Sequence, residues 1–171
     1  RSEPSVELHF APKPHQKVQQ QAFSLKEINA IESFKLANPK FLTTSDTTKL
    51  AYYDFADNQS KSIVIIYTGA GLYGNKTYQY VAKTLKDSYN IGSYIFDLRG
   101  HGHSEGPRGD APSINRVLLD VDETINFVYQ QHPNGKIYLV GHSSGAGLLI
   151  NYAANFIDPL VELDTYSWHP I

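Results

Sequence analysis

The residues best suited to chemistry stand between Gly141 and Gly145, where the chain reads Gly-His-Ser-Ser-Gly. A short apolar run ends just before them, and a segment rich in small residues that suit a helix follows them. Gly-x-Ser-x-Gly between a strand and a helix is the nucleophile elbow of serine hydrolases, in which the serine stands on a sharp turn. The flanking glycines fit, because a Cβ at either position would collide where strand and helix pass closely. We therefore predict that Ser143 is the nucleophile of an acyl-transfer reaction.

A glycine-rich loop, residues 68–74, could supply a second part of such a site. Acyl transfer needs backbone N–H groups aimed at the oxyanion that develops on the substrate. Where the nucleophile stands on an elbow, one N–H belongs to the next residue and another to a glycine-rich loop after an earlier strand. This pattern predicts an oxyanion hole formed by the backbone amides of Ala70 and Ser144.

The same loop has two other interpretations. It could be a plain turn between a strand and a helix. It could also bind a dinucleotide, because Gly69, Gly71 and Gly74 form Gly-x-Gly-x-x-Gly after a strand, and Asp97 follows the next strand at a tolerable offset for a ribose. The elbow further along the chain argues against the dinucleotide interpretation.

A second glycine-rich loop, Asp97–Gly106, follows the next expected strand. His101 and His103 lie two residues apart and suggest a metal site, but no third ligand clusters with them and the glycines favour a tight structural loop. We therefore expect no metal site. We expect Asp97 and Arg99 to hold this turn by hydrogen bonds rather than to react.

A serine nucleophile also needs a base that takes its proton and a carboxylate that orients the base. On this kind of scaffold the chain order is serine, acid, histidine. His142 is not the expected base, because a residue next to the nucleophile points away across the turn. Asp164 and His169 satisfy the order, but the acid and the base normally arrive on loops from different later strands, so we expect both outside the 171 residues. The acids and the histidine that follow Ser143 are Asp158, Glu162, Asp164 and His169.

Alternating strand and helix patterns predict the elements that position these residues. Apolar residues recur at a spacing of 3.6 after Ser113, a predicted N-cap, which indicates a long helix that ends at His132. Strands that alternate with such helices indicate right-handed crossovers and a mostly parallel, doubly wound α/β sheet, which a hairpin at the front makes mixed. The expected apolar face of the long helix comprises Ile114, Val117, Leu118, Val121, Ile125 and Val128. The expected elements are a hairpin (41–55), a strand (62–67), a helix (76–88), a strand (92–96), the long helix (113–132), the elbow strand (137–141) and a further strand at 160–163.

The chain divides into three parts. Residues 1–22 carry three prolines and a polar tract, and we expect a poorly ordered leader such as one left after a targeting signal is removed, or else an arm packed on the domain. Residues 23–40 are expected to be a helical segment, with Ser24 as N-cap and Glu27 as its reciprocal partner. Residues 41–171 are expected to be the N-terminal part of one domain, with a sheet truncated after the helix that follows the elbow.

Composition excludes several classes of protein. The net charge of −2 gives no electrostatic basis for binding nucleic acid or an anionic membrane. The sequence contains no run of 18 apolar residues, so we expect no transmembrane segment. The absence of cysteine excludes a thiolate nucleophile and a thiolate metal site in this sequence. Composition does not fix the compartment, which could be the cytoplasm or, after removal of a signal, the periplasm or the exterior.

Residues 41–156 resemble the N-terminal half of α/β-hydrolases of the monoglyceride lipase, lysophospholipase and serine aminopeptidase group. Three segments carry the resemblance in the right order: residues 68–71, where relatives usually have His-Gly-x-Gly and this chain has Thr68; residues 97–106; and residues 141–145. The resemblance implies Ser143 as nucleophile, the Ala70 and Ser144 amides as oxyanion hole, and no cofactor. It further implies hydrolysis of carboxylic esters through an acyl-enzyme, with monoacylglycerols or lysophospholipids as substrates.

Two alternatives stay open, because one fold hosts many functions. The chain could belong to a non-catalytic protein that uses the hydrolase fold to bind a ligand or a partner. It could also hydrolyse peptides or thioesters on the same scaffold. In each case we expect a second segment or chain to complete the sheet, because a sheet that ends near residue 163 would expose an apolar edge.

Overall fold

The computed structural model describes residues 29–30, 33–69, 74, 76–156 and 161–163. The predicted leader at residues 1–22 lies outside the described residues, as does most of the helical segment predicted from Ser24, of which residues 29, 30 and 33 are helical. Ala70, Gly71, Asp158, Asp164 and His169 also lie outside them.

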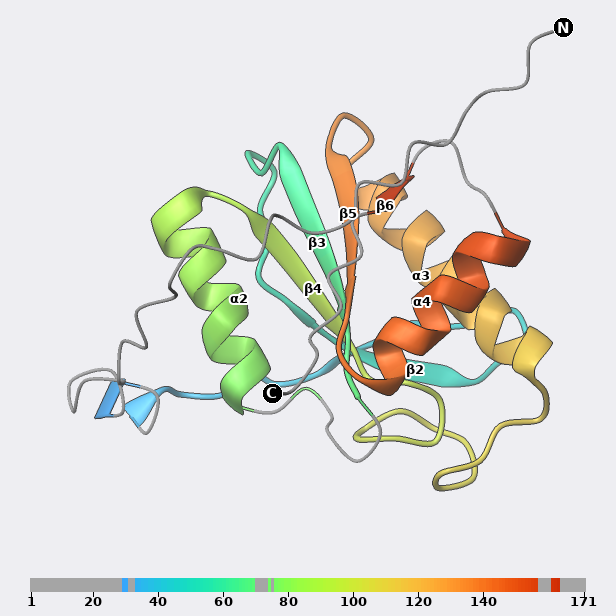
Figure 1. The fold of residues 1–171 in the computed structure, drawn as a ribbon. Coiled ribbons are helices and arrows are strands. Elements are labelled where there is room, and N and C mark those ends of the chain that lie inside the picture. Colours follow the sequence, from blue (N-terminus) through green and yellow to red (C-terminus); the bar gives the residue numbers. More distant parts are fainter. Residues whose placement is uncertain (1–28, 31–32, 70–73, 75, 157–160, 164–171) are drawn as a thin grey trace, which may run out of the picture.

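The described strands form a six-stranded mixed sheet in the order β1-β2-β4-β3-β5-β6 (Figure 1). An antiparallel hairpin of β1 (Lys40–Thr43) and β2 (Lys49–Asp54) forms one side, and β2 pairs antiparallel with β4 (Gly92–Phe96). Strand β3 (Ser62–Tyr67) lies parallel between β4 and β5 (Lys136–Gly141). The short β6 (Val161–Leu163) pairs parallel with β5, where the sequence predicts a further strand. The prediction of a mostly parallel α/β sheet with a hairpin at the front is confirmed.

Helices cover both faces of the sheet (Figure 1). Helix α2 (Lys76–Tyr89) lies on one face, while α3 (Ile114–Gln131) and α4 (Ser144–Asn155) lie on the other. Ile63 and Ile65 of β3 belong to the larger core, which includes residues of α3 and α4, whereas Ile66 packs with Ala82 of α2. Strand β3 is therefore buried on both faces, as its continuous apolar run predicts.

Helix α3 shows where helical periodicity predicts burial and where it fails. Ser113 caps it, because the Ser113 hydroxyl accepts a hydrogen bond of 3.1 Å from the Arg116 amide. The prediction was wrong at one position, since Ile114 is 60% exposed. Contacts between this helix and the core begin at Val117, so the first turn extends beyond the packed surface. The residues of the predicted face that are buried are Leu118, Val121, Ile125 and Val128.

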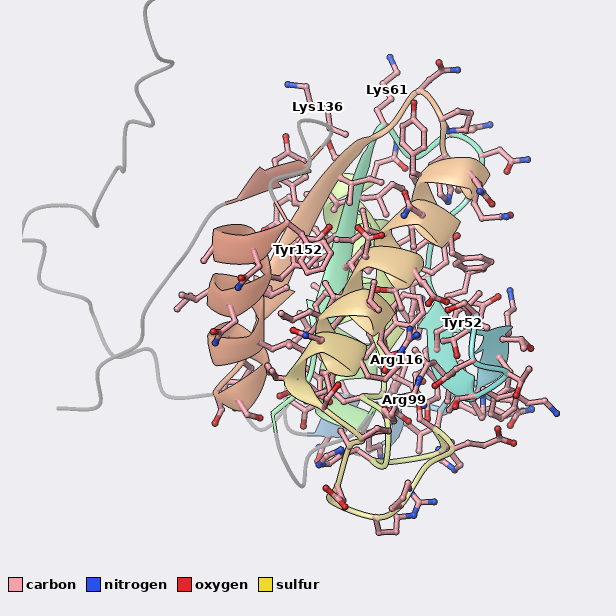
Figure 2. The ribbon with its side chains drawn as sticks, turned by 90° about the vertical axis from the view of Figure 1, so that its right-hand side faces the viewer. Tyr52, Lys61, Arg99, Arg116, Lys136 and Tyr152 are labelled. Carbon is pink, nitrogen blue, oxygen red and sulfur yellow. The ribbon has the colours of Figure 1, made fainter. Side chains whose placement is uncertain are left out.

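A buried ion-pair network joins the hairpin, the loop after β4 and helix α3. Arg99 donates from Nε and an Nη to the two carboxylate oxygens of Asp120, at 2.7 and 2.8 Å. Its guanidinium also donates to Thr48 at 2.6 Å and to Asp46 of the hairpin turn at 3.0 Å. Arg116 donates to Asp120 as well, at 3.0 Å. Figure 2 shows Arg99 and Arg116 close together at one end of the molecule. The prediction that Arg99 holds the turn is therefore confirmed.

Replacing Asp46 with Asn tests this network through its pH dependence. Hydrogen bonding from Arg99 holds the pKa of Asp46 below its usual range, so the ionised form stabilises the fold above the unfolded-state pKa of about 3.9. This contribution is lost as the pH falls below that value towards the lower pKa of the folded state. We expect Asp46→Asn to lower the free energy of unfolding by about 1 kcal/mol at pH 7, because the carboxylate is partly exposed, and by progressively less from pH 5 to pH 3.

Urea unfolding at pH 7, 5, 4 and 3 measures this difference. Asp87→Asn is the matched control, because its carboxylate forms an exposed pair with Lys83 on α2. It should change the free energy of unfolding by less than about 0.5 kcal/mol. An Asp46→Asn deficit that is as large at pH 3 as at pH 7 would contradict the assignment.

Candidate active site

The candidate nucleophile stands on a strained turn between β5 and α4. Strand β5 ends at Gly141 and helix α4 begins at Ser144, which leaves Ser143 at the N-cap position with φ 56° and ψ −119°. A positive φ is uncommon outside glycine, and such a residue persists only where its surroundings hold it. Ser143 is exposed to solvent. The predicted strand–turn–helix context is therefore present, with Ser143 at its apex.

The two glycines of the motif are required by close packing. A Cβ on Gly141 would lie 2.5 Å from the amide nitrogen of Ala146, inside α4. A Cβ on Gly145 would lie 2.9 Å from the carbonyl oxygen of Thr68 and closer still to that of Tyr67, at the end of β3. These separations are far below van der Waals contact, so helix α4 can start here only because both positions lack a side chain.

The loop after β3 meets the elbow at Gly69. A Cβ there would lie 3.1 Å from the Cβ of Ser143 and 3.2 Å from the carbonyl oxygen of His142. The His142 amide also donates to the carbonyl of Tyr67, at 3.1 Å. Gly69 and Ser143 therefore lie against each other, and each directly precedes one of the two residues predicted to donate to the oxyanion. Ala70 lies outside the described residues, so its amide stays a prediction, while Ser144 is the first residue of α4.

His142 is engaged with helix α2. Its Nδ1 lies 2.7 Å from the hydroxyl of Tyr78, and the two ring centroids are 6.1 Å apart. Tyr78 lies 64 residues earlier in the chain, and no local pattern in the sequence marks the pair.

Asp97 is a buried carboxylate that joins the two glycine-rich loops. It accepts hydrogen bonds from the backbone amides of Gly74 and, at 3.0 Å, His103. Burial raises the pKa of Asp97, while these amides act to lower it. The carboxylate therefore holds Gly74, at the end of one loop, against His103 in the other, which agrees with the structural role predicted for it.

Gln79 of α2 holds the same loop and was not predicted from the sequence. Its side-chain amide donates to the Gly74 carbonyl at 2.8 Å and accepts from the Ala37 amide at 2.8 Å. The sequence shows only a glutamine within a predicted helix, and the structure shows that this side chain is buried. A satisfied buried amide of this kind fixes a loop without taking part in chemistry.

The imidazoles of His101 and His103 make separate contacts. His101 Nδ1 lies 3.0 Å from the carbonyl oxygen of Arg99, and His103 Nδ1 lies 2.9 Å from the hydroxyl of Tyr53. Within the part of the chain that the structure describes, no three metal-ligating side chains of His, Asp or Glu gather in one place. Both contacts belong to the packing of the loop that follows β4.

The candidate acids and the candidate base stay predictions. Asp158, Asp164 and His169 lie outside the described residues, and Glu162 is described only by its backbone in β6. The described residues thus bring together Ser143, Ser144, His142 and Gly69, and they leave the rest of the predicted triad untested.

Substitution of two glycines in helix α4 tests the close packing at the elbow. We expect Gly145→Ala to lower the free energy of unfolding by about 1–3 kcal/mol, because the new methyl group would meet backbone oxygens that cannot turn aside. Gly147→Ala is the matched control, since a Cβ there meets nothing within 4 Å. It should raise that free energy by about 0.5–1 kcal/mol through helix propensity. Urea unfolding measures both, and equal effects of the two substitutions would contradict the close-packing account.

Comparison with known protein families matches the chain to one of them. The family described as serine aminopeptidase, S33, matches residues 58–161. The protein YnbC of Escherichia coli (strain K12) is 30% identical over 131 residues, which cover 74% of this chain and 22% of that protein. The monoglyceride lipase of Rattus norvegicus is 30% identical over 94 residues, 55% of this chain and 30% of that one. The protein phosphatase methylesterase 1 of Candida albicans is 29% identical over 92 residues, 54% of this chain and 24% of that one.

Solved structures share the fold of this chain, and they and the relatives show how much of each protein the chain covers. The α/β hydrolase GrgF from Penicillium superposes with a TM-score of 0.61 at 23% identity, over 72% of this chain and 43% of that one. The esterase EaEST from Exiguobacterium antarcticum gives a TM-score of 0.58 at 25% identity, over 72% of this chain and 42% of that one. The chain spans between a fifth and a third of the length of the three relatives above. No helix in the described ranges is both long and apolar enough to cross a membrane.

The resemblance predicted from three short segments is therefore confirmed over more than half of the chain. The chain belongs to the α/β-hydrolase superfamily, in the family described as serine aminopeptidase, S33.

Proposed function

We propose that the full-length protein is a serine hydrolase that cleaves carboxylic esters through an acyl-enzyme on Ser143. The observation that carries this proposal is the backbone of Ser143, which stands exposed at φ 56° on the turn between β5 and α4. The ψ of −119° lies far from the left-handed helical region, where ψ is about +30° to +60°, and backbone strain of this kind clusters at active sites.

The proposed reaction begins when the Ser143 hydroxyl attacks the acyl carbonyl of the substrate. The carbonyl oxygen becomes an oxyanion, and the amides of Ala70 and Ser144 are the proposed donors to it. Ser144 supports this role as the first residue of α4, where the helix macrodipole places partial positive charge. The contact between Gly69 and Ser143 supports the role of Ala70, because Gly69 is the residue directly before Ala70 in the loop.

The proposed base and acid come from outside the described residues. A histidine would take the Ser143 proton and return it to the leaving alcohol, and a carboxylate would hold the imidazole in the correct tautomer. Water would then attack the acyl-enzyme and release the carboxylic acid, with the same histidine as base. Asp164 and His169 have the required order along the chain, and residues of the full-length protein beyond Ile171 are the preferred source.

The relatives support a carboxylic ester as substrate. Their names include monoglyceride lipase and protein phosphatase methylesterase, which denote ester-cleaving proteins, and the fold neighbours include esterases. We propose monoacylglycerols and lysophospholipids as the substrate class, since each presents one acyl ester on a polar head group.

Labelling with a fluorophosphonate tests the proposed nucleophile, because this reagent phosphonylates an activated serine. We expect the full-length protein to be labelled and Ser143→Ala to abolish labelling, since no other hydroxyl replaces the nucleophile. Ser88→Ala, at an exposed serine of α2, is the control and should be labelled as the wild type is. Intact-mass measurement reads out the adduct. A folded wild-type protein that stays unlabelled would instead support the non-catalytic binding protein.

Peptide hydrolysis is the second candidate function, because the matching family is described as serine aminopeptidase. We expect the full-length protein to hydrolyse 4-nitrophenyl butyrate with a higher kcat/KM than an aminoacyl 4-nitroanilide, since the proposed substrate is an ester. Both substrates release a coloured product, so one absorbance assay compares them. A higher kcat/KM for the anilide would transfer the proposal from esters to peptides and leave the role of Ser143 intact.

A further inference from the structure

We propose that Tyr78 is a positioning residue that holds the loop after β3 against the nucleophile elbow, an inference that rests on the proposed function. Tyr78 lies in the first turn of α2, on a third element that contributes neither the proposed nucleophile nor a proposed oxyanion donor. Its hydroxyl nevertheless bonds to both segments that carry those groups.

Two hydrogen bonds converge on the Tyr78 hydroxyl. One joins it to Nδ1 of His142 at 2.7 Å, within the elbow. The other is with Gly69, in the loop after β3: the Gly69 backbone acts on the Tyr78 phenol as a hydrogen-bond donor, and a Cβ built on Gly69 would lie 3.4 Å from that same Nδ1 of His142. Burial raises the pKa of Tyr78, and the bond from Gly69 acts in the opposite direction, as an N–H donor to a phenol oxygen does.

The chemistry of the groups fixes the direction of one of these bonds. A backbone amide can only donate, so the phenol oxygen accepts from Gly69. The direction of the Tyr78–His142 bond follows the His142 tautomer: the phenol donates when the imidazole proton is on Nε2 and accepts when it is on Nδ1. Tyr78 therefore bridges a backbone amide of one segment and a side chain of the other in one chain of hydrogen bonds.

The bridge falls where geometry matters most for the proposed reaction. Gly69 directly precedes Ala70, and His142 stands two residues before Ser144, so the hydroxyl joins the segments that carry the two proposed donors. An oxyanion hole works when its donors lie about 2.7–3.1 Å from the oxyanion, and a misplacement of about 1 Å can slow the reaction about 100-fold. The separation of these two segments is thus the quantity that Tyr78 is proposed to set.

Helix α2 is well placed to act as this brace. Gln79, the next residue, is buried and donates to the Gly74 carbonyl at 2.8 Å, so the start of the helix is fixed to the end of the same loop. Ala82 of α2 packs with Ile66 of β3 in the core on this face. The Tyr78 hydroxyl is therefore presented by a helix that is itself anchored to β3 and to the loop.

Tyr78→Phe tests the proposal, because it removes both hydrogen bonds and keeps the ring. We expect kcat for 4-nitrophenyl butyrate to fall about tenfold, with KM changed less than about twofold, since only the transition state uses the oxyanion donors. The inhibition constant of a trifluoromethyl ketone, which forms a tetrahedral adduct with the nucleophile, should rise by about the same factor. The midpoint of thermal unfolding should fall by only a few degrees, roughly the effect of losing two hydrogen bonds.

Two further variants separate positioning from packing. Tyr80→Phe, two residues along the same helix, removes a hydroxyl outside this bridge and should retain wild-type kcat. His142→Phe removes one partner of the bridge, and Tyr78→Phe should then have a smaller effect on kcat than it has in the wild type. Equal losses in the Tyr80 and Tyr78 variants, or a fall in kcat matched by a large rise in KM and a large loss of thermal stability, would overturn the proposal.

Fluorophosphonate labelling distinguishes the failure of this inference from that of the proposed function. If the wild type is labelled at Ser143 and Tyr78→Phe hydrolyses the ester at the wild-type rate, the bridge is unnecessary and only this inference fails. If the folded wild type is neither labelled nor active, the proposed function fails and the bridge has no reaction to position.

Discussion

The close approach of helix α4 to the end of β3 is the constraint on which the rest of the site depends. Gly145 lies so near the carbonyl oxygens of Tyr67 and Thr68 that no side chain fits between them. The amide of His142 donates to that same Tyr67 carbonyl, so the end of β3 contacts the elbow both before and after Ser143. With strand and helix fixed in this way, Ser143 must turn the chain within one residue, and the positive φ follows. The surroundings therefore maintain a backbone conformation that would cost about 1–3 kcal/mol if it had to form alone.

Asp46, which is partly exposed, and Asp97, which is buried, show that the environment of a carboxylate determines its structural role. Asp46 faces the Arg99 guanidinium, and this hydrogen bonding lowers its pKa. Asp97 is more deeply buried and accepts from backbone amides, and burial raises its pKa. The first acid joins the hairpin to helix α3 by way of Arg99, and the second joins the two glycine-rich loops. Polar contacts thus support the described parts of the loops beside Ser143, which is itself exposed.

Local pattern was sufficient to predict the strands, helices α2, α3 and α4 and the elbow, because each depends on residues close together in the sequence. The run at 62–67, the cap at Ser113 and the glycines around Ser143 all express local geometry. Periodicity failed at Ile114 because it identifies a helix face and not where along the helix the packing begins. The pairs Arg99–Asp120 and Tyr78–His142 were beyond reach for a different reason. The paired residues are 21 and 64 positions apart in the sequence, and only the strand order of the sheet brings such partners together.

The direction of the parallel strands separates the candidate site from a hollow elsewhere on the molecule. A hollow of about 910 Å³ lies at the amino ends of β3 and β5, and Lys61 and Lys136, which border it, stand at the end of the molecule opposite Arg99 (Figure 2). Helices α2 and α3 end on that side, at Tyr89 and Gln131, so they present carbonyl oxygens and partial negative charge. Helix α4 begins on the other side, at Ser144, and presents partial positive charge next to Ser143. An oxyanion is favoured beside a helix start and disfavoured beside a helix end. Strand direction, rather than the volume of a hollow, is therefore the reason to place the proposed ester chemistry at the carboxyl edge of this sheet.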